Sequence, residues 1–160
     1  MLPNKFFLTC GSGRDEDPII SFGLALKEAG ITQFNLVKVS SIIPPKCNLI
    51  PKEEGLNFLS TGQVVHCVLA RQNTNADELI SASIGVAFPW DKDKPGCIYE
   101  LTGVGKSKAT LGREAEKLAR SLLSKTLDLE PYKSLNISCE AIGITHIYTT
   151  VIAAAVFVRE

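Results

Sequence analysis

Residues 35–51 read NLVKVSSIIPPKCNLIP, and this stretch poses the question that the rest of the chain must answer. Its first residues are mostly apolar and predict a strand. The strand ends in two adjacent serines, Ser40 and Ser41, and the pair Pro44-Pro45 makes the chain rigid soon afterwards. For an arbitrary serine pair, the simplest interpretation is that both hydroxyls bond to the local backbone. A second interpretation assigns chemistry to the peptide bond between them.

In that second interpretation, the Ser41 hydroxyl attacks the carbonyl carbon of Ser40 and converts the peptide into an ester. β-Elimination from Ser41 then cuts the backbone, and hydrolysis of the resulting dehydroalanine leaves a pyruvoyl group at the new N-terminus. Such a reaction needs a distorted peptide, a hydrogen-bond donor for the oxyanion and rigid surroundings. Asn35 is a candidate donor, and the proline pair supplies rigidity.

Length and composition predict a single globular domain over residues 1–160. Hydrophobic residues make up 45% of the 160 residues, which is enough for one core, and no linker or repeat divides the chain. Lys+Arg and Asp+Glu both number 17, and neither a basic stripe nor a long apolar run is present, so we expect no nucleic-acid or membrane partner. The N-terminus does not resemble a signal peptide, and we expect a cytoplasmic protein.

Working outward from the serine pair, the pattern predicts about seven strands and two helices without βαβ alternation, and therefore an α+β layered sandwich. Asp17 is a good N-cap with Pro18 at the first helical position, and Gly30 ends that helix. The polar segment before it, 11–17, predicts a loop. The expected helices cover residues 18–29 and 109–127, and the expected strands cover 5–10, 34–39, 63–70, 79–88, 97–101, 137–144 and 146–158.

Several motifs that suggest other chemistry are weaker than they look. The five cysteines are not at metal-ligand spacing and their number is odd, so we expect free thiols, no disulfide framework and no metal site. The segment GVGKS, residues 103–107, resembles part of a phosphate-binding loop. The first glycine of that loop would fall at Glu100, whose carboxylate would repel phosphate, so nucleotide binding is not favoured.

Resemblance to a known family decides between the two interpretations of the serine pair. The segment GLALKEAGITQFNLVKVSSIIPP, residues 23–45, resembles the processing region of the pyruvoyl-dependent arginine decarboxylases. The similarity continues through ELISASIGVAFPWDKDKPGCIYELTG, residues 78–103, and through AEKLA, residues 115–119, so it covers nearly the whole chain. A weaker resemblance, to the pyruvoyl-dependent histidine decarboxylases, concerns the fold. Together these resemblances imply a four-layer αββα sandwich.

The resemblance also implies a role for individual residues. Ser40-Ser41 is the expected self-cleavage bond, which would yield residues 1–40 as a β subunit and residues 41–160 as an α subunit. Ser41 would become the pyruvoyl group, a covalent cofactor that withdraws electrons from a bound amino acid as pyridoxal phosphate does elsewhere. Asn35 falls at the family's active-site asparagine and Glu100 at its catalytic glutamate, the general acid. The residues alone would make Glu100 a solvent-facing strand residue.

The implied activity is decarboxylation of L-arginine to agmatine and CO2, which feeds polyamine synthesis, in a trimer or dimer of trimers of αβ units with active sites between neighbouring protomers. This sequence departs from the family's pattern at Gly23, where the family carries an aspartate that pairs with the substrate guanidinium. Glu28 or one of the acids in 15–17 is then the candidate substrate-binding group. The alternatives are a decarboxylase of another amino acid and a non-catalytic paralogue that binds an amine.

Overall fold

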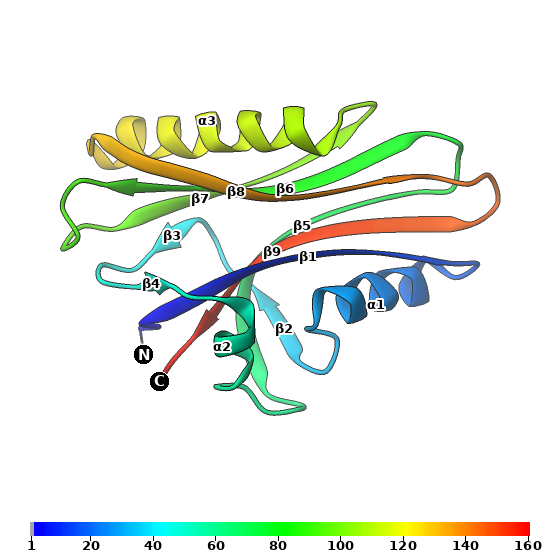
Figure 1. Cartoon of the computed structure of the whole chain (residues 1–160), viewed down its shortest axis with the longest axis horizontal. Helices are drawn as coiled ribbons and strands as arrows, with labels where there is room; N and C mark the ends of the chain where they lie inside the picture. Colours follow the sequence, from blue (N-terminus) through cyan, green and yellow to red (C-terminus); the bar gives the residue numbers. More distant parts are fainter. Residues whose placement is uncertain (1) are drawn as a thin grey trace.

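The computed structural model describes residues 2–160 as two β-sheets stacked face to face, with helices on both outer surfaces (Figure 1). In chain order the elements are β1 Lys5–Asp15, α1 Pro18–Ala29, β2 Asn35–Lys38, β3 Ile42–Ile43, β4 Asn48–Leu49, α2 Lys52–Leu56, β5 Val64–Thr74, β6 Leu79–Pro89, β7 Gly96–Val104, α3 Lys108–Leu127, β8 Pro131–Ile142 and β9 Tyr148–Val158. The predicted α+β, four-layer αββα sandwich is confirmed.

The first sheet has the strand order β2-β5-β9-β1-β4, and α1 packs on its outer face. Asp17 caps α1 as predicted, because its carboxylate accepts hydrogen bonds from the backbone N–H groups of Ile19 and Ile20. Gly30 ends the helix with a left-handed φ of 82°. The core under α1 comes from residues that alternate along β5 and β9.

The predicted loop over residues 11–17 is wrong for its first part, because β1 runs on to Asp15. Polar residues fit there because the ladder with β9 extends from Lys5 to Asp15 and needs only their backbone. Gly11 and Gly13 serve close packing: a Cβ at Gly11 would come within 2.4 Å of a backbone oxygen of α1. Glycine therefore lets the helix lie directly on the strand.

The second sheet has the order β3-β7-β6-β8, and α3 covers its outer face. Strand β6 is buried along almost all of its length, as expected for a central strand between a helix and another sheet. The space between the two sheets holds one apolar cluster, to which Ile80, Ile84 and Ile98 contribute from one side and Val68 and Val151 from the other. Within residues 2–160, no helix has both the length and the apolar character needed to cross a membrane.

Candidate active site

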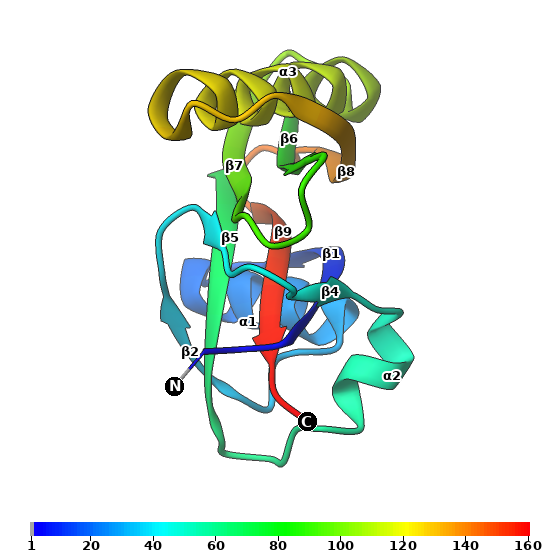
Figure 2. The same ribbon diagram turned by 90° about the vertical axis from the view of Figure 1, so that its left-hand side faces the viewer.

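The serine pair lies where the chain crosses from one sheet to the other. Strand β2 pairs with β5 in the first sheet, and β3 pairs with β7 in the second. The residues between them, 39–41, form the crossover, which Figure 2 shows as the cyan segment rising from β2 to β3. A bond here belongs to neither β-ladder.

Both ends of the crossover are fixed by backbone hydrogen bonds. The N–H of Val39 donates to the carbonyl of Cys67 at 2.9 Å, and the carbonyl of Ser41 accepts from the N–H of Ile98 at 2.7 Å. Ser40 is exposed and Ser41 is half-buried. The Ser40-Ser41 bond is therefore accessible while the residues around it are held.

Glu100 lies on the strand that anchors Ser41. It is two residues beyond Ile98 on β7, so its side chain and that of Ile98 leave the same face of the strand, toward the first sheet. Glu100 is exposed and lines a cavity of about 400 Å³. The structure thus places the predicted general acid on the strand to which the carbonyl of Ser41 is hydrogen-bonded.

The same cavity is lined by two cationic side chains. Lys38 comes from the end of β2 and Arg71 from β5, with Leu69, Ala70 and Thr102 completing the lining. The Arg71 guanidinium carbon lies 3.8 Å from the centre of the Phe22 ring of α1. Sequence reasoning missed both cations, although a charged residue directly after the apolar run of β5 was a visible signal.

Asn35, the predicted processing residue, lies at the opposite end of β2. Its side-chain amide donates to the carbonyl of Gly62 at 2.7 Å. Because Asn35 to Val39 is extended alongside β5, the two residues are separated by about 13 Å along the strand. Within one chain, the structure does not bring the Asn35 amide to the Ser40 carbonyl.

The two predicted substrate-binding residues are also apart from Glu100. Gly23 lies on the outward side of α1, where an added Cβ would meet nothing within 4 Å, and it does not line the cavity, although its neighbour Phe22 contacts Arg71. Glu28 packs over β1, since its Cβ lies 3.1 Å from the position that a Cβ of Gly11 would take. Strand β9 separates β1 from β5, so Glu28 of α1, which lies over β1, is apart from Arg71 of β5.

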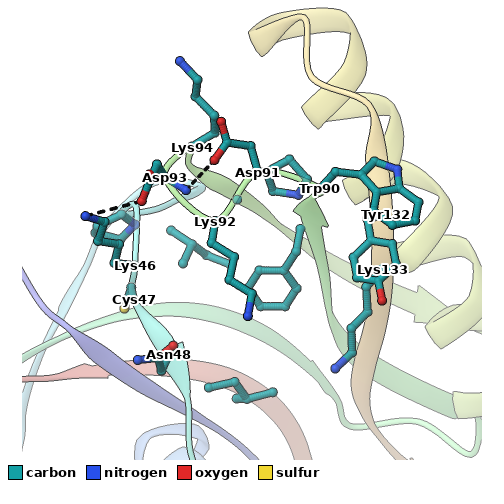
Figure 3. A pocket seen from close by; sticks show the side chains of 16 residues that line it. Lys46, Cys47, Asn48, Trp90, Asp91, Lys92, Asp93, Lys94, Tyr132 and Lys133 are labelled. Carbon is teal, nitrogen blue, oxygen red and sulfur yellow. Dashed lines mark hydrogen bonds and ion pairs between the residues drawn. The ribbon is translucent and has the colours of Figure 1, made fainter.

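A larger cavity, of about 720 Å³, lies at one end of the sandwich. Figure 3 shows Trp90 and Tyr132 stacked on one side of it, with their ring centres 3.9 Å apart, and the side chains of Lys92 and Lys133 extending into it. It contains none of the predicted catalytic residues, so its size alone does not make it the active site.

The residues around the serine pair fit the formation of a pyruvoyl group. Cutting the Ser40-Ser41 bond interrupts neither ladder, because β2 remains paired with β5 and β3 with β7. The N-terminal piece would keep all of β1, whose ladder with β9 runs from Lys5 to Asp15. Cleavage at this bond would therefore leave both pieces paired in the two sheets.

The αββα sandwich, the serine pair at the sheet crossover and the carboxylate on the neighbouring strand match what the resemblance to the pyruvoyl-dependent decarboxylases implied. The family model described as pyruvoyl-dependent arginine decarboxylase matches residues 5–160, and the chain belongs to this family, as the resemblance predicted.

Proteins with this name from several organisms are similar to the chain. Pyruvoyl-dependent arginine decarboxylase 1 of Archaeoglobus fulgidus is 45% identical over 159 residues, which cover 99% of both chains. Pyruvoyl-dependent arginine decarboxylase 2 of Methanosarcina mazei is 47% identical over 131 residues, covering 81% of this chain and 72% of the relative. The protein of Thermoplasma volcanium is 43% identical, with 99% of this chain and 98% of the relative covered.

Proposed function

We propose that this protein is a self-processing, pyruvoyl-dependent decarboxylase that converts L-arginine into agmatine and CO2. The observation that carries this proposal is the position of Ser40-Ser41, at a sheet crossover whose far end is anchored to β7 two residues before Glu100. Membership of the arginine decarboxylase family supports arginine as the substrate.

Processing requires only groups of the chain itself. The Ser41 hydroxyl attacks the Ser40 carbonyl carbon, the C–N bond breaks, and the ester that forms is cleaved by β-elimination. Hydrolysis of the new N-terminal dehydroalanine releases ammonia and leaves the carbonyl group on residue 41. The hydrogen bond from Ile98 to the Ser41 carbonyl holds residue 41 in place during these steps.

In catalysis, the pyruvoyl group supplies an electron sink for the carbanion that remains when CO2 leaves. Glu100 then acts as general acid and delivers a proton to the substrate α-carbon. In this chain the carboxylate faces the cavity from β7, and Leu69 and Ala70 form an apolar part of the opposite wall. A neighbouring protomer that covers the cavity would exclude water from it and strengthen these electrostatic interactions.

The assembly is part of the proposal. Asn35 lies about 13 Å from Val39 in its own chain, so its role in processing requires it to act on a neighbouring protomer. A trimer, or a dimer of trimers, with active sites between protomers provides such neighbours. We propose that this assembly acts in the cytoplasm and feeds polyamine synthesis through agmatine.

Denaturing mass spectrometry of Ser41→Ala tests the proposal. The wild-type chain should yield two fragments, residues 1–40 and 41–160, whereas the variant should remain a single chain of about 17.3 kDa without decarboxylase activity. Ser40→Ala is the matched comparison: it keeps the attacked carbonyl and the Ser41 hydroxyl, so cleavage should continue. Normal fragmentation of Ser41→Ala would refute the assignment of the bond.

An uncut wild-type chain that binds amines but releases no CO2 would support the non-catalytic paralogue instead. Release of amine from lysine, ornithine, histidine or aspartate in preference to arginine would support a decarboxylase of another amino acid. The specific observation that favours this second candidate is Gly23, which stands where the family carries an aspartate.

A further inference from the structure

The charges that line the Glu100 cavity do not balance. Lys38 and Arg71 bring two cationic groups and Glu100 brings one carboxylate. None of the three forms an ion pair within 4.0 Å in the part of the chain that the structure describes. A ligand that brings a carboxylate would neutralise the excess positive charge.

We propose that Arg71, assisted by Lys38, forms a carboxylate-binding subsite in the cavity that Glu100 lines, for a carboxylate of the amino-acid substrate. This inference rests on the proposed function, because the substrate is the occupant. A guanidinium group suits the role, since its planar fork can donate two parallel hydrogen bonds to one carboxylate.

The subsite is held in place by its surroundings. The Arg71 guanidinium lies over the Phe22 ring at 3.8 Å, and Phe22 belongs to α1, which packs on the same sheet. This cation–π contact limits the orientations of an otherwise flexible side chain. An arginine that is ordered before the substrate arrives loses less conformational entropy on binding.

The pairing of the strands explains why the cavity opens here. Strand β2 pairs with β5 only from Val64 to Cys67, where the crossover begins. Beyond Cys67, β5 has no partner on that side within residues 2–160, and its residues 69–71 face the cavity that Glu100 lines. Arg71 follows Leu69 on the face of β5 that packs on α1, whereas Glu100 lies on the face of β7 toward the first sheet, so the cavity connects them around this open edge.

The chemistry of decarboxylation predicts which kinetic constant will change. If Arg71 binds the α-carboxylate, its partner leaves as neutral CO2, so the interaction is stronger in the ground state than in the transition state. Its removal should raise KM and leave kcat unchanged or higher. Loss of a charge-assisted hydrogen bond corresponds to a change of about tenfold to a hundredfold.

The test compares Arg71→Met with Arg71→Lys, and uses Arg113→Met as a control with the same change of charge at an exposed position on α3. In processed enzyme, Arg71→Met should raise KM for arginine about tenfold or more, while the inhibition constant of agmatine, which lacks the carboxylate, stays within twofold. Arg71→Lys should restore part of the affinity, and Arg113→Met should match wild type. Equal changes for arginine and agmatine, or none, would overturn the proposal.

Aspartate distinguishes the two possible sources of the carboxylate. If wild type decarboxylates aspartate with a higher kcat/KM than arginine, and Arg71→Met removes that preference, the subsite holds a side-chain carboxylate. That result would support the carboxylate subsite and refute the assignment of arginine as the substrate.

Calorimetric binding to Ser41→Ala separates failure of the subsite from failure of the proposed function, because this variant needs neither processing nor turnover. Arginine or aspartate should bind more tightly than agmatine, and the double variant Ser41→Ala/Arg71→Met should lose that difference. Agmatine binding as tightly as both amino acids would overturn the subsite even if the wild-type chain is processed normally.

Discussion

The two long edges of the sandwich are built differently. We call the edge formed by β2 and β3 the serine edge, since the chain itself crosses there through Ser40-Ser41. We call the edge where β1 faces β8 the cysteine edge. There the Cys10 thiol donates a hydrogen bond to the Ser138 carbonyl oxygen at 3.8 Å, beside Cys139 on β8.

The difference lies in whether the polar groups have partners. At the cysteine edge the Cys10 thiol donates to the Ser138 carbonyl, and the N–H of Lys108 donates to the Glu140 carboxylate at 2.8 Å. At the serine edge, Lys38, Arg71 and Glu100 line a cavity without pairing with one another. The charged groups of the serine edge are exposed and have no charged partner within residues 2–160, so they are available to a ligand, whereas the polar groups named at the cysteine edge already have partners.

Glu100→Gln should have the largest effect on turnover of the variants that still fold and are processed. The amide keeps the shape of the side chain but loses the acidic proton, so we expect normal fragments by mass spectrometry and a kcat about 10²–10⁴-fold lower. Glu53→Gln, an exposed acid on α2, is the control and should keep full turnover. If Glu100→Gln kept the wild-type kcat, another residue would have to be the proton donor.

Gly23→Asp should have a smaller effect, on KM for arginine. The position is open, so the side chain fits without clash and restores the acid that the family carries there. We expect KM for arginine to fall about twofold to fivefold, the range of a solvent-exposed ion pair. Gly23→Asn has nearly the same shape without the charge and should leave KM unchanged.

An equal fall in KM for both Gly23 variants would show that shape or helix stability, rather than charge, causes the change. Glu28→Gln completes the comparison. Since Glu28 lies over β1, away from the serine edge of its own chain, a rise in KM on its substitution would mean that it reaches the active site of a neighbouring protomer.

Local signals in the sequence accounted for the elements that depend on neighbouring residues. Asp17 and Gly30 mark the ends of α1 because caps are local features, and the long apolar strands follow from periodicity. The two-residue strands β3 and β4 were missed because their pairing depends on β7 and β1, which are distant in sequence. The extension of β1 to Asp15 was missed for the same reason.

In the candidate site, too, some residues could be predicted from the sequence and others depended on the tertiary structure. Ser40, Ser41 and Glu100 were predicted from the resemblance to the family, and the fold places Glu100 on β7, the strand to which Ser41 is hydrogen-bonded. Arg71 was missed because its role depends on Phe22 and on the place where β2 ends, which only the tertiary structure determines. The separation of Asn35 from the serine pair likewise follows from the extended strand between them.

Modification of Cys10, at the cysteine edge, should have the smallest effect on turnover, because we expect it to leave catalysis unchanged. The hydrogen bond from the Cys139 thiol lowers the pKa of Cys10 from 9.0 to about 7, against the opposing contributions of burial and Glu28. Burial raises the pKa of Cys67 to about 11. Because the thiolate is the nucleophile, alkylation of Cys10 by iodoacetamide should rise between pH 6 and pH 8 and then level off, while Cys67 stays unmodified. Peptide mass mapping after timed alkylation measures both rates.

Cys139→Ser is the control variant. A weaker hydrogen-bond network around Cys10 should move the pH at which Cys10 alkylation rises toward pH 9. An unchanged pH profile would mean that Cys139 does not set the reactivity of Cys10.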